Sequence, residues 1–346
     1  MATATTQATF RCYELGEFGI DSLAIKDRQA TNLKPSEVLV KVHAVSLNFR
    51  DLMMVMGRYN PKMKLPFTPC SDGSGTVVEV GSDVKKFKAG DRVMAAFMPD
   101  WTAGKLHEDA GRSALGGGGT GMLAEQVILP EHGLVHIPNH LSFEEAATLP
   151  CAAVTAWNAL IESGNLRPGE TVLTLGTGGV SIFAIQFALM NGCDIIATSG
   201  SDAKLARLKE MGVTKTINYK TTPDWSKEVL KLTGNRGVDH VVEVGGAGTL
   251  DHSLKSTALA GHVAVIGVLS GVQTDLNPRL ILMKNIRVQG IFVGSRQMFE
   301  NMNRAIEQHK LKPVIDKVFP FEQAIDALKW MESGSHFGKI VINVSK

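Results

Sequence analysis

The sequence predicts an α/β protein that consists of a β-rich N-terminal lobe followed by a doubly wound parallel-sheet domain. The main indication comes after residue 170, where short apolar runs alternate with helical stretches, the pattern of βαβ units around a parallel sheet. The N-terminal part instead carries short apolar runs separated by Gly and Pro, which is typical of a β-rich lobe. A chain of 346 residues is long enough to give both parts a core.

Composition narrows the classes of partner. The 36 Lys and Arg residues nearly balance the 34 Asp and Glu residues, so the net charge of +2 gives no field that favours nucleic acid or an anionic membrane. We therefore expect a small-molecule ligand. The four cysteines are far apart and form no CxxC pair, which argues against a disulfide framework and a four-cysteine zinc lobe. Residues 1–10 lack the basic and apolar regions of a secretory signal, so the expected compartment is the cytoplasm.

The N-terminal elements are expected in the following order. Apolar runs predict strands at 38–45, 73–80 and 91–95, and a short helix is expected at 48–56. The glycine run at 116–121 predicts a loop, because glycine holds regular structure poorly.

A capping box, Ser142 with Glu145, then opens a helical stretch that extends to residue 161 and that Pro150 should kink or split. The uncharged stretch 171–193 contains glycines and polar residues that favour a strand, a turn and a helix over a membrane span. The remaining elements are expected as strands 171–175, 194–198, 216–219, 238–244, 262–266, 286–293 and 339–344, and helices 180–190, 202–211, 224–232, 249–259 and 321–330.

A glycine-rich turn joins the first strand of this series to its helix. Glycines there permit a tight turn and close approach of a diphosphate to the backbone, while the helix N-terminus offers free N–H groups and a positive dipole end. The turn therefore predicts a dinucleotide site, and the alternative is a close-packed βα turn without a ligand. The expected contacts are Gly176, Thr177, Gly178, Gly179 and Val180.

The end of the second strand indicates which dinucleotide binds. An NAD site places Asp or Glu there to bind the ribose 2′-hydroxyl, whereas this strand ends without an acid. The nearby hydroxyls and cation suit a 2′-phosphate, so NADPH is favoured over NADH. Asp202 weakens this preference if it points at the ribose, but it is otherwise explained as an acidic residue at a helix N-terminus. The residues assigned to the phosphate are Ser199, Ser201, Lys204 and Tyr219.

Three runs of residues, 150–160, 175–180 and 217–219, resemble the medium-chain dehydrogenase/reductase superfamily, and the chain is most similar to its zinc-independent quinone oxidoreductase and enoyl reductase branch. The resemblance extends from residue 38 to residue 341. It implies a GroES-like catalytic domain at 1–140, completed by 300–346, and a Rossmann NADP-binding domain at 141–299, with an active-site cleft where they meet. Residues 48–51 resemble the Asn-x-x-Asp signature of that branch.

The zinc-dependent branch of the superfamily provides a test. Its catalytic ligands are a Cys, a His followed by Glu, and a second Cys, and the corresponding positions here are Asn48, Ser71 with Asp72, and Cys151. Only one soft ligand remains, and Cys151 is otherwise explained as a small buried thiol. The region of the structural zinc, 100–119, contains no cysteine. We therefore expect no metal.

The resemblance implies reduction of a quinone, or of the C=C bond of an α,β-unsaturated carbonyl, by hydride transfer from NADPH without zinc. Asn48 would orient the substrate carbonyl or the nicotinamide ribose, and Thr155 would contact the nicotinamide. Tyr59 is either a donor or stacking residue or an exposed loop aromatic. Family analogy adds backbone lining of the cofactor channel from Gly245, Ile266, Val268, Leu269, Phe292 and Val293.

Two other functions stay open at this point. One is an alcohol dehydrogenase that binds a metal through Cys151 and Asp72. The other is a non-catalytic NADPH-binding protein that acts as a sensor or in a structural role. The resemblance further suggests a homodimer that pairs through the edge strand at 289–293.

Overall fold

The computed structural model describes residues 9–117, 119–271, 273 and 276–345. It divides into two compact units, one formed by residues up to Cys151 together with those from Gly294 onward, and one formed by Ala152–Val293. The sequence-based boundary at residue 140 lies before the helix that Ser142 caps, and this helix belongs to the first unit.

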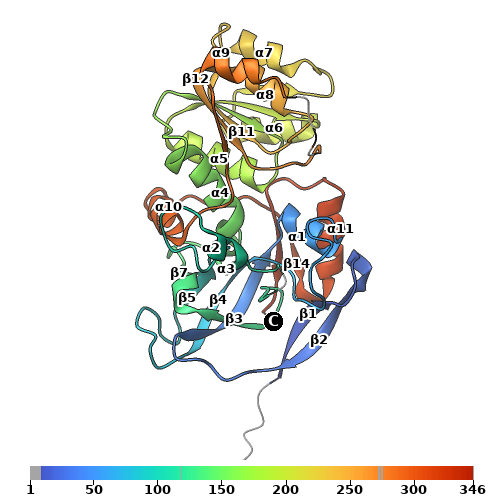
Figure 1. The fold of residues 1–346 in the computed structure, drawn as a ribbon, viewed down its shortest axis with the longest axis vertical. Helices are drawn as coiled ribbons and strands as arrows, with labels where there is room; N and C mark the ends of the chain where they lie inside the picture. Colours follow the sequence, from blue (N-terminus) through green and yellow to red (C-terminus); the bar gives the residue numbers. More distant parts are fainter. Residues whose placement is uncertain (1–8, 118, 272, 274–275, 346) are drawn as a thin grey trace, which may run out of the picture. The chain divides into compact units, whose positions relative to one another are not determined.

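The first unit is built on a mixed seven-stranded sheet in the order β14-β15-β3-β4-β5-β7, with β6 paired to β3. Figure 1 shows β3 and β4 side by side, as their antiparallel register requires. Strands β14 and β15 come from the C-terminal segment, so this segment completes the N-terminal sheet. The bounds are β3 (Glu37–Ser46), β4 (Asp72–Val80), β5 (Arg92–Ala95), β6 (Gln126–Pro130), β7 (Leu134–His136), β14 (Ile315–Pro320) and β15 (Lys339–Asn343).

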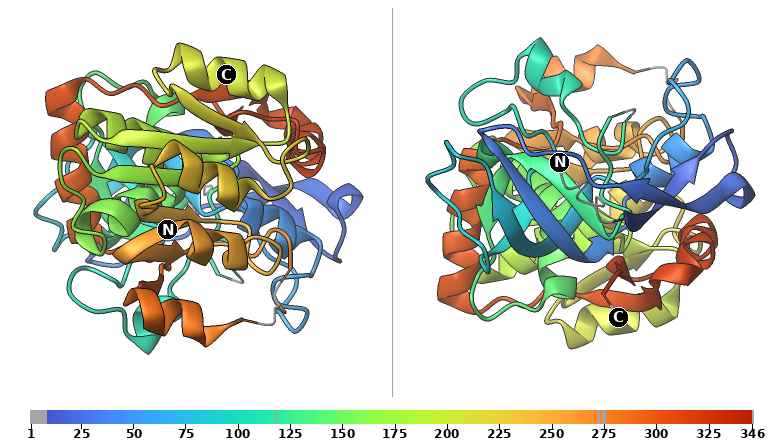
Figure 2. Two further views of the ribbon diagram at one scale, coloured as in Figure 1. Left: turned by 90° about the horizontal axis from the view of Figure 1, so that it is seen from above. Right: turned by 90° about the horizontal axis from the view of Figure 1, so that it is seen from below.

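Several elements of this unit are absent from the sequence-based expectations. Strands β1 (Thr9–Leu15) and β2 (Leu23–Gln29) form a separate antiparallel pair, which the right-hand view of Figure 2 shows in blue. Strands β6 and β14 and helices α2 and α10 were also not anticipated. The helices are α1 (Phe49–Val55), α2 (Glu108–Arg112), α3 (Phe143–Ala147), α10 (Arg296–His309) and α11 (Ala324–Glu332), with single 3-10 turns at Ile20–Ser22, Glu131–Gly133 and Phe321–Gln323.

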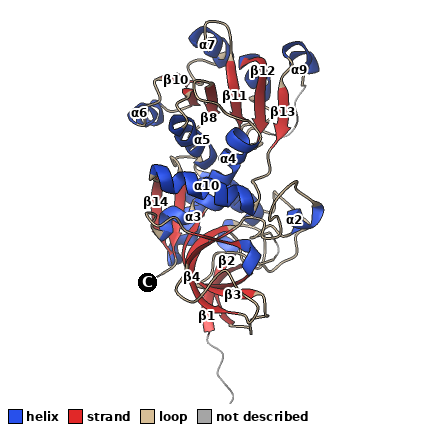
Figure 3. Cartoon of the chain, turned by 90° about the vertical axis from the view of Figure 1, so that its left-hand side faces the viewer, coloured by secondary structure: helices blue, strands red, loops and turns tan. Residues whose placement is uncertain are grey.

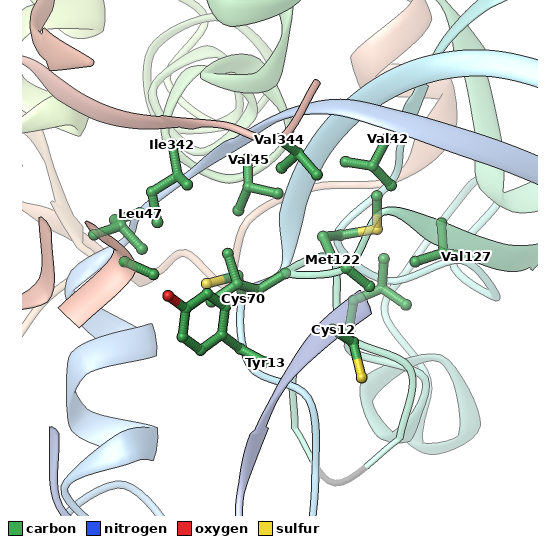
Figure 4. Packing of buried hydrophobic residues seen from close by; sticks show 14 of the residues in the cluster. Cys12, Tyr13, Val42, Val45, Leu47, Cys70, Met122, Val127, Ile342 and Val344 are labelled. Atoms are coloured by element: carbon green, nitrogen blue, oxygen red, sulfur yellow. The ribbon is translucent and has the colours of Figure 1, made fainter. Parts of the chain in front are cut away.

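The core of the first unit follows the alternation of β3. Val38, Val40 and Val42 lie on one face of this strand and are each at most 2% exposed. Figure 4 shows Val42 in the same apolar cluster as Ile342 and Val344 from the C-terminal segment. This shared burial fixes β15 beside β3.

Close packing explains the glycine run at its two ends. A Cβ at Gly116, whose φ is +63°, would lie 2.6 Å from the carbonyl carbon of Cys70, and one at Gly121 would lie 1.9 Å from the Thr68 oxygen. Only glycine fits against this backbone segment. The described part of the run is a loop, as expected, and Gly118 lies outside the described residues.

The second unit contains a six-stranded, entirely parallel sheet in the order β10-β9-β8-β11-β12-β13. Counted from its first strand this is 3-2-1-4-5-6, the doubly wound order of dinucleotide-binding sheets, so the predicted fold class is confirmed. Figure 3 shows β8, β11, β12 and β13 as neighbouring strands. The bounds are β8 (Thr171–Leu175), β9 (Asp194–Ser199), β10 (Lys215–Asn218), β11 (Val238–Glu243), β12 (Thr257–Val265) and β13 (Arg287–Gly290).

Helix α4 precedes the first strand of this sheet, and helices α5 to α9 connect its successive strands. The left-hand view of Figure 2 shows them with the strands, coloured green to orange. The uncharged stretch 171–193 divides into β8 and α5, and no helix in the described residues is long and apolar enough to cross a membrane. The bounds are α4 (Val154–Trp157), α5 (Gly179–Met190), α6 (Asp202–Glu210), α7 (Trp225–Leu232), α8 (Leu250–Ser256) and α9 (Pro278–Lys284).

Pro150 interrupts the helical stretch that begins at Ser142, as predicted. Helix α3 ends at Ala147, and wide π-type turns at Leu149–Ala153 and Asn158–Glu162 flank the short α4. Proline has no N–H to donate and crowds the preceding turn, so the regular hydrogen-bond ladder cannot pass through it.

Two predicted elements are too long. The helix expected to reach residue 259 ends at Ser256, because the hydroxyls of Ser256 and Thr257 donate back to the carbonyls of His252 and Ser253 and β12 begins at once. The strand expected at 286–293 is only β13, and the chain leaves the sheet before Val293, whose φ is +54°.

Candidate functional site

The glycine turn of the second unit forms at the carboxyl end of β8, next to the point where the strand order reverses. Gly176 has a φ of +70°, and its N–H donates to the Thr198 carbonyl at 2.9 Å, which fixes the turn to β9. Gly178 is the N-cap of α5, and no side chain in the described part of the chain caps this helix. Within the same residues, a Cβ at Gly176 or Gly178 would meet no atom within 4 Å. The first N–H groups of α5 therefore suit an anionic ligand.

A hydrogen bond and burial also fix the turn against the rest of the second unit. Ser181 Oγ donates to the Leu175 carbonyl at 2.7 Å, and Thr177 is 5% exposed. All five predicted contacts, from Gly176 to Val180, therefore belong to one fixed strand-to-helix turn.

The end of β9 places hydroxyl groups beside the start of α6. Ser199 Oγ accepts from the Ser201 N–H at 3.3 Å, and Ser201 Oγ accepts from the Lys204 N–H at 3.4 Å and so caps α6. The carboxylate of Asp202 accepts a hydrogen bond from Asn218 Nδ2 at 2.7 Å. This contact provides the structural explanation for Asp202 that the sequence left open.

Tyr219 follows β10 and is 43% exposed. A Cβ at Gly200 would lie 2.7 Å from Tyr219 Oη and 2.9 Å from Lys220 Cε, so both side chains lie over Gly200. Lys220 was missed in the sequence, although its position next to Tyr219 was the signal that could have identified it. With Lys204 it brings a second cation to this end of the sheet.

The loop after β11 is organised by Glu243, which is fully buried and was not singled out from the sequence. Its Oε1 accepts from the N–H groups of Gly245 and Gly246 at 2.7 and 2.9 Å and from Thr249 Oγ1 at 2.6 Å, while Oε2 accepts from the Ser253 hydroxyl. The carbonyl of Gly245 accepts from the Ser270 N–H at 2.7 Å. The N–H and the carbonyl of Gly245 are thus both hydrogen-bonded within the protein.

The other predicted channel residues differ in exposure. Val268 and Leu269 are each 55% exposed and Phe292 is 40% exposed, whereas Ile266 is partly buried. Val293 is buried, and its carbonyl accepts from Asn158 Nδ2 at 2.7 Å. Thr155 is 3% exposed within α4.

The first unit contains a buried polar cluster that begins at the N-terminus of α1. The backbone N–H of Asn48 donates to Asp51 Oδ2 at 2.8 Å in a capping box. Asp51 is fully buried, and its Oδ1 has no hydrogen-bond partner among the described residues. Burial raises the pKa of the Asp51 carboxyl to about 6, against the opposing effect of the Arg50 charge.

The cluster continues through the side chain of Asn48. Its Oδ1 accepts from Lys339 Nζ at 2.6 Å, and its Nδ2 donates to Ser71 Oγ at 3.4 Å. Ser71 Oγ donates to Asp72 Oδ1 at 2.8 Å, and Asp72 Oδ2 accepts from the Cys151 N–H at 3.0 Å. The structure therefore brings together all the positions at which the zinc-dependent branch carries its catalytic ligands. It adds Lys339, which the sequence analysis did not assign to the site.

The electrostatics of this cluster keep its thiol protonated. Asp72 is fully buried, and burial raises the pKa of its carboxyl, while the Lys339 ammonium and the hydrogen-bond donors oppose that shift. Burial, followed by the charge of Asp72, raises the pKa of the Cys151 thiol far above its usual range. Cys151 therefore lies in the cluster as a neutral thiol.

These donors do not fit zinc. An amide, a hydroxyl and a neutral thiol are weak ligands, and both carboxylate oxygens of Asp72 are already engaged by donors. The ammonium of Lys339, 2.6 Å from Asn48 Oδ1, would repel a dication at the same place. In the described ranges no group of three or more His, Cys, Asp and Glu side chains is arranged to hold a metal ion.

Tyr59 lies in a loop and is 48% exposed. The Arg50 guanidinium carbon lies 5.4 Å from the centre of its ring and 4.9 Å from that of Phe97. Tyr59 thus belongs to a cation–π group in which Arg50 contacts both the exposed Tyr59 ring and the buried Phe97 ring.

A cavity of about 600 Å³ in the second unit lies at the opposite, amino ends of the strands, lined by residues that include Glu170, His240 and His262. It is therefore separate from the glycine turn.

Two models of known protein families match the chain, one in its N-terminal part and one mainly in the second unit. Residues 34–139 match the family model described as an alcohol dehydrogenase GroES-like domain, and residues 179–308 match the model described as a zinc-binding dehydrogenase. The fold and these matches define an oxidoreductase with a GroES-like domain and a Rossmann-type domain of the kind that binds nicotinamide cofactors.

Full-length relatives identify the family. A zinc-type alcohol dehydrogenase-like protein from Schizosaccharomyces pombe is 46% identical over 94% of this chain and 96% of its own length. A quinone oxidoreductase-like protein 2 homolog from Nematostella vectensis is 32% identical over 97% of this chain and 88% of its own. The chain belongs to the medium-chain dehydrogenase/reductase superfamily.

Solved structures agree with this assignment. A crystal structure described as an NAD-dependent alcohol dehydrogenase matches with a TM-score of 0.88 and 36% identity, covering 97% of this chain and 100% of that one. A 2-octenoyl-CoA carboxylase reductase in complex with NADP and 2-octenoyl-CoA matches with a TM-score of 0.84 and 25% identity, covering 97% of this chain and 87% of that one.

Proposed function

We propose that this oxidoreductase uses NADPH to reduce a quinone, or the C=C bond of an α,β-unsaturated carbonyl, without zinc. The observation that carries the proposal is the polar cluster around Asn48, which has an amide and a hydroxyl at two of the metal-ligand positions and contains in addition a buried ammonium. Without a Lewis acid an alcohol is hard to deprotonate, so an acceptor that is already electron-poor fits this donor set better. The quinone oxidoreductase-like relative and the NADP-bound octenoyl-CoA reductase support the same class of reaction.

In this proposal the second unit binds the cofactor. The N-terminus of α5 holds the diphosphate, and the hydroxyls of Ser199 and Ser201 with the cations Lys204 and Lys220 hold the 2′-phosphate. Because Asp202 is bonded to Asn218, it does not serve as the acid that would recognise a ribose 2′-hydroxyl. When bound, the nicotinamide supplies the hydride.

The first unit supplies the polar group that acts on the substrate. As hydride adds to the β carbon of an enone, electrons move to the carbonyl oxygen, and an N–H of Asn48 stabilises the charge that develops there. A proton taken up from solvent then completes the reduction. Thr155 contacts the nicotinamide, and Tyr59 at the surface has no step of its own in this scheme.

Initial rates test the reaction. We expect turnover with NADPH and quinones or enones that persists with a chelator present, in protein containing less than stoichiometric metal. The structure described as an NAD-dependent alcohol dehydrogenase favours the second candidate, a metal-dependent alcohol oxidation through Cys151 and Asp72. One equivalent of zinc whose removal abolishes activity would establish that candidate. Cofactor binding without turnover on any acceptor or alcohol would indicate a sensor or structural protein.

Replacing Lys204 by Glu tests the choice of cofactor. A charge-assisted contact with a phosphate contributes about 1.5–3 kcal/mol, so the dissociation constant for NADPH should rise about tenfold to hundredfold while that for NADH changes little. Lys209, exposed in the last turn of the same helix, gives a matched control, K209E, with the same change in net charge. Equal losses for NADPH and NADH in K204E would refute the 2′-phosphate assignment.

We further propose a homodimer that pairs through β13, the edge strand of the parallel sheet. Val288 on this strand is 37% exposed, and Leu282 and Met283 on α9 are 78% and 66% exposed. Sedimentation should show a dimer that V288K weakens, and a monomer at micromolar concentration would refute the pairing.

The free cysteines fit a reducing compartment, and we place the protein in the cytoplasm.

A further inference from the structure

We propose that the cavity at the amino ends of the parallel strands is a second ligand site, which binds a small organic anion that also carries a hydroxyl group. The anionic group is a carboxylate or a phosphate ester. This inference does not depend on the proposed function, because the lining residues belong to the second unit, at the end of the sheet opposite the glycine turn. The volume of about 600 Å³ is within the usual range for small-molecule sites.

Three side chains that line the cavity form a row across one face of the sheet. His240 on β11 is the register partner of His262 on β12, which in turn is the partner of Arg287 on β13. Partners on neighbouring parallel strands point to the same face. The ring centres of the two histidines are 5.8 Å apart. The Arg287 guanidinium donates to the carbonyls of Ser163 and Gly164, which fixes it beside the segment that precedes β8.

A bulge in β12 shapes one wall of the cavity. Between the pairs Val238–Thr257 and His240–His262, β12 uses more residues than β11, so its chain bulges out of the regular pairing. Ala260 in this bulge lines the cavity and has a φ of +59°, a conformation that residues other than glycine rarely adopt. The sheet is therefore irregular at the place where the histidine row begins.

The two histidines carry buried ring nitrogens that the protein leaves unpaired. His240 is 4% exposed and His262 is 3% exposed, and both line the cavity. Both ring nitrogens of His262, and Nδ1 of His240, have no hydrogen-bond partner among the described residues. Unpaired polar groups are costly to bury, so three of them on adjacent rings at one cavity indicate a ligand that pairs with them.

The donors and acceptors of the row define the groups that the ligand carries. Glu170 Oε2 accepts from His240 Nε2 at 2.9 Å, so this nitrogen carries the hydrogen of the neutral ring. Nδ1 of His240 is then an acceptor, which suits a hydroxyl group of the ligand. The ring of His262 and the guanidinium of Arg287 supply N–H donors, which suit the oxygens of a carboxylate or a phosphate.

The charges around His262 favour an anion over a metal cation. Burial, followed by the positive charges of Arg287 and His240, lowers the pKa of the His262 imidazole to about 4. The same positive charges attract an anion and repel a metal ion. The ligand that fits the row is therefore negatively charged.

The two carboxylates that line the cavity are already engaged by donors. Glu170 Oε2 accepts from the Arg167 N–H at 2.7 Å in addition to its histidine partner. Asp239 accepts from the Arg236 guanidinium and from the Thr171 N–H, the latter at 2.9 Å. The side chain of Arg167 also lines the cavity and brings a further positive charge to it. These carboxylates therefore do not prevent an anion from binding.

Titration calorimetry of the full-length protein tests the site. The probes are glycerol 3-phosphate, glycerate and glycerol, which all carry hydroxyl groups and differ in the charged group. We expect saturable binding of at least one of the two anions and no detectable binding of glycerol. Tighter binding of glycerol 3-phosphate would assign a phosphate ester, and tighter binding of glycerate would assign a carboxylate. Failure of both anions to bind at about 10 mM would overturn the proposal, as would glycerol binding as tightly as the anions.

Variants show where the anion binds. His262→Leu and Arg287→Met should each weaken its binding about tenfold to hundredfold, because each removes a donor to a charged group. Arg279, exposed on α9, gives a matched control, R279M, for which we expect a change of less than about twofold because solvent screens an exposed charge. If R287M does not fold, H262L provides the test alone. Undiminished binding in H262L would overturn the proposal.

A local readout separates this site from the nucleotide site. In histidine-labelled protein, the ring signals that disappear in H262L belong to His262, and we expect them to shift when the anion is added. Unchanged ring signals would contradict the proposal. Anion binding that is lost in K204E and kept in H262L would place the probe at the glycine turn, which would also overturn the second site. A wild-type enzyme inactive on quinones and enones that still binds the anion through His262 would overturn only the proposed reaction.

Discussion

Replacing Asp51 by Asn should make the stability of the first unit less dependent on pH. The carboxyl is fully buried, and its pKa is raised from 3.8 to about 6 in the folded state. Each pKa unit corresponds to about 1.36 kcal/mol, so the shift amounts to about 3 kcal/mol. Asn keeps an oxygen that can accept from the Asn48 N–H, which preserves the capping box.

The sign follows from proton binding. Between about pH 4 and pH 6 the folded protein holds a proton on Asp51 that the unfolded chain has released, so the free energy of unfolding falls as pH rises through this range. The D51N variant has no titrating carboxyl at this position, so its free energy of unfolding does not fall for this reason. The stability of D51N minus that of wild type should therefore increase by about 2.5 kcal/mol from pH 4 to pH 7, because a small part of the loss in wild type has already occurred at pH 4. His262, whose pKa burial lowers to about 4, shifts stability in the opposite direction, but it contributes equally to both proteins and cancels.

Urea unfolding at several pH values between 4 and 7 measures this difference. The two units need not unfold together, so the fluorescence signal must come from the first unit alone. Wild type and D51N are therefore both compared in a background in which Trp157 and Trp225, the tryptophans of the second unit, are replaced by Phe. Asp27, exposed on β2, gives a control, D27N, for which we expect a flat difference. A D51N difference that stays constant within about 0.5 kcal/mol across the range would show that Asp51 is charged throughout, and the reasoning from burial would fail.

Three further outcomes are expected. Glu243→Gln can keep its oxygen on the backbone N–H groups of Gly245 and Gly246, but it removes the negative charge of the acceptor and turns its NH2 group toward the Ser253 hydroxyl, so it should lower the stability of the second unit by about 1–2 kcal/mol. A lower urea midpoint would show this, and an unchanged midpoint would contradict it. Gly178→Ala should raise the NADPH dissociation constant about tenfold or more and lower the melting temperature only slightly, because Ala is a weaker N-cap than Gly, while Gly111→Ala should leave NADPH binding unchanged. Normal NADPH binding in G178A would argue against a diphosphate at the turn. Gly121→Ala should destabilise the first unit by about 1–3 kcal/mol, since its Cβ would lie 1.9 Å from the Thr68 oxygen. Calorimetry should show a lower melting temperature, and an unchanged melting temperature would contradict this prediction.

The sequence predicts the nucleotide-binding part of the site well because its signals are local. The glycine turn, its strand and its helix occupy consecutive residues, and periodicity and glycine spacing identify all three. Errors there concern the ends of elements. The hydroxyls of Ser256 and Thr257 ended a helix that apolar periodicity would have continued.

The polar cluster was predicted only in part because its members are distant in sequence. Lys339 lies 291 residues from Asn48, and nothing in the segment around residue 339 indicates which strand β15 will join. Glu243 was missed for a related reason. A carboxylate at the end of a strand can be recognised as a buried acceptor only when the positions of its four hydrogen-bond donors are known. The resemblance to the zinc-dependent branch identified Asn48, Ser71, Asp72 and Cys151 as one group but gave no signal for the cation among them.

The origin of β14 and β15 also affects how the chain folds during synthesis. The second unit is continuous from Ala152 to Val293, so it can fold as soon as the ribosome releases it. The first unit must wait, because the strands that flank β3 on one side come after residue 314. Until then the β3 edge and the Asn48 region lack their partners and are exposed to aggregation and proteolysis. We expect nascent chains arrested before β15 to bind chaperones through the N-terminal segment while the nucleotide-binding unit is already formed.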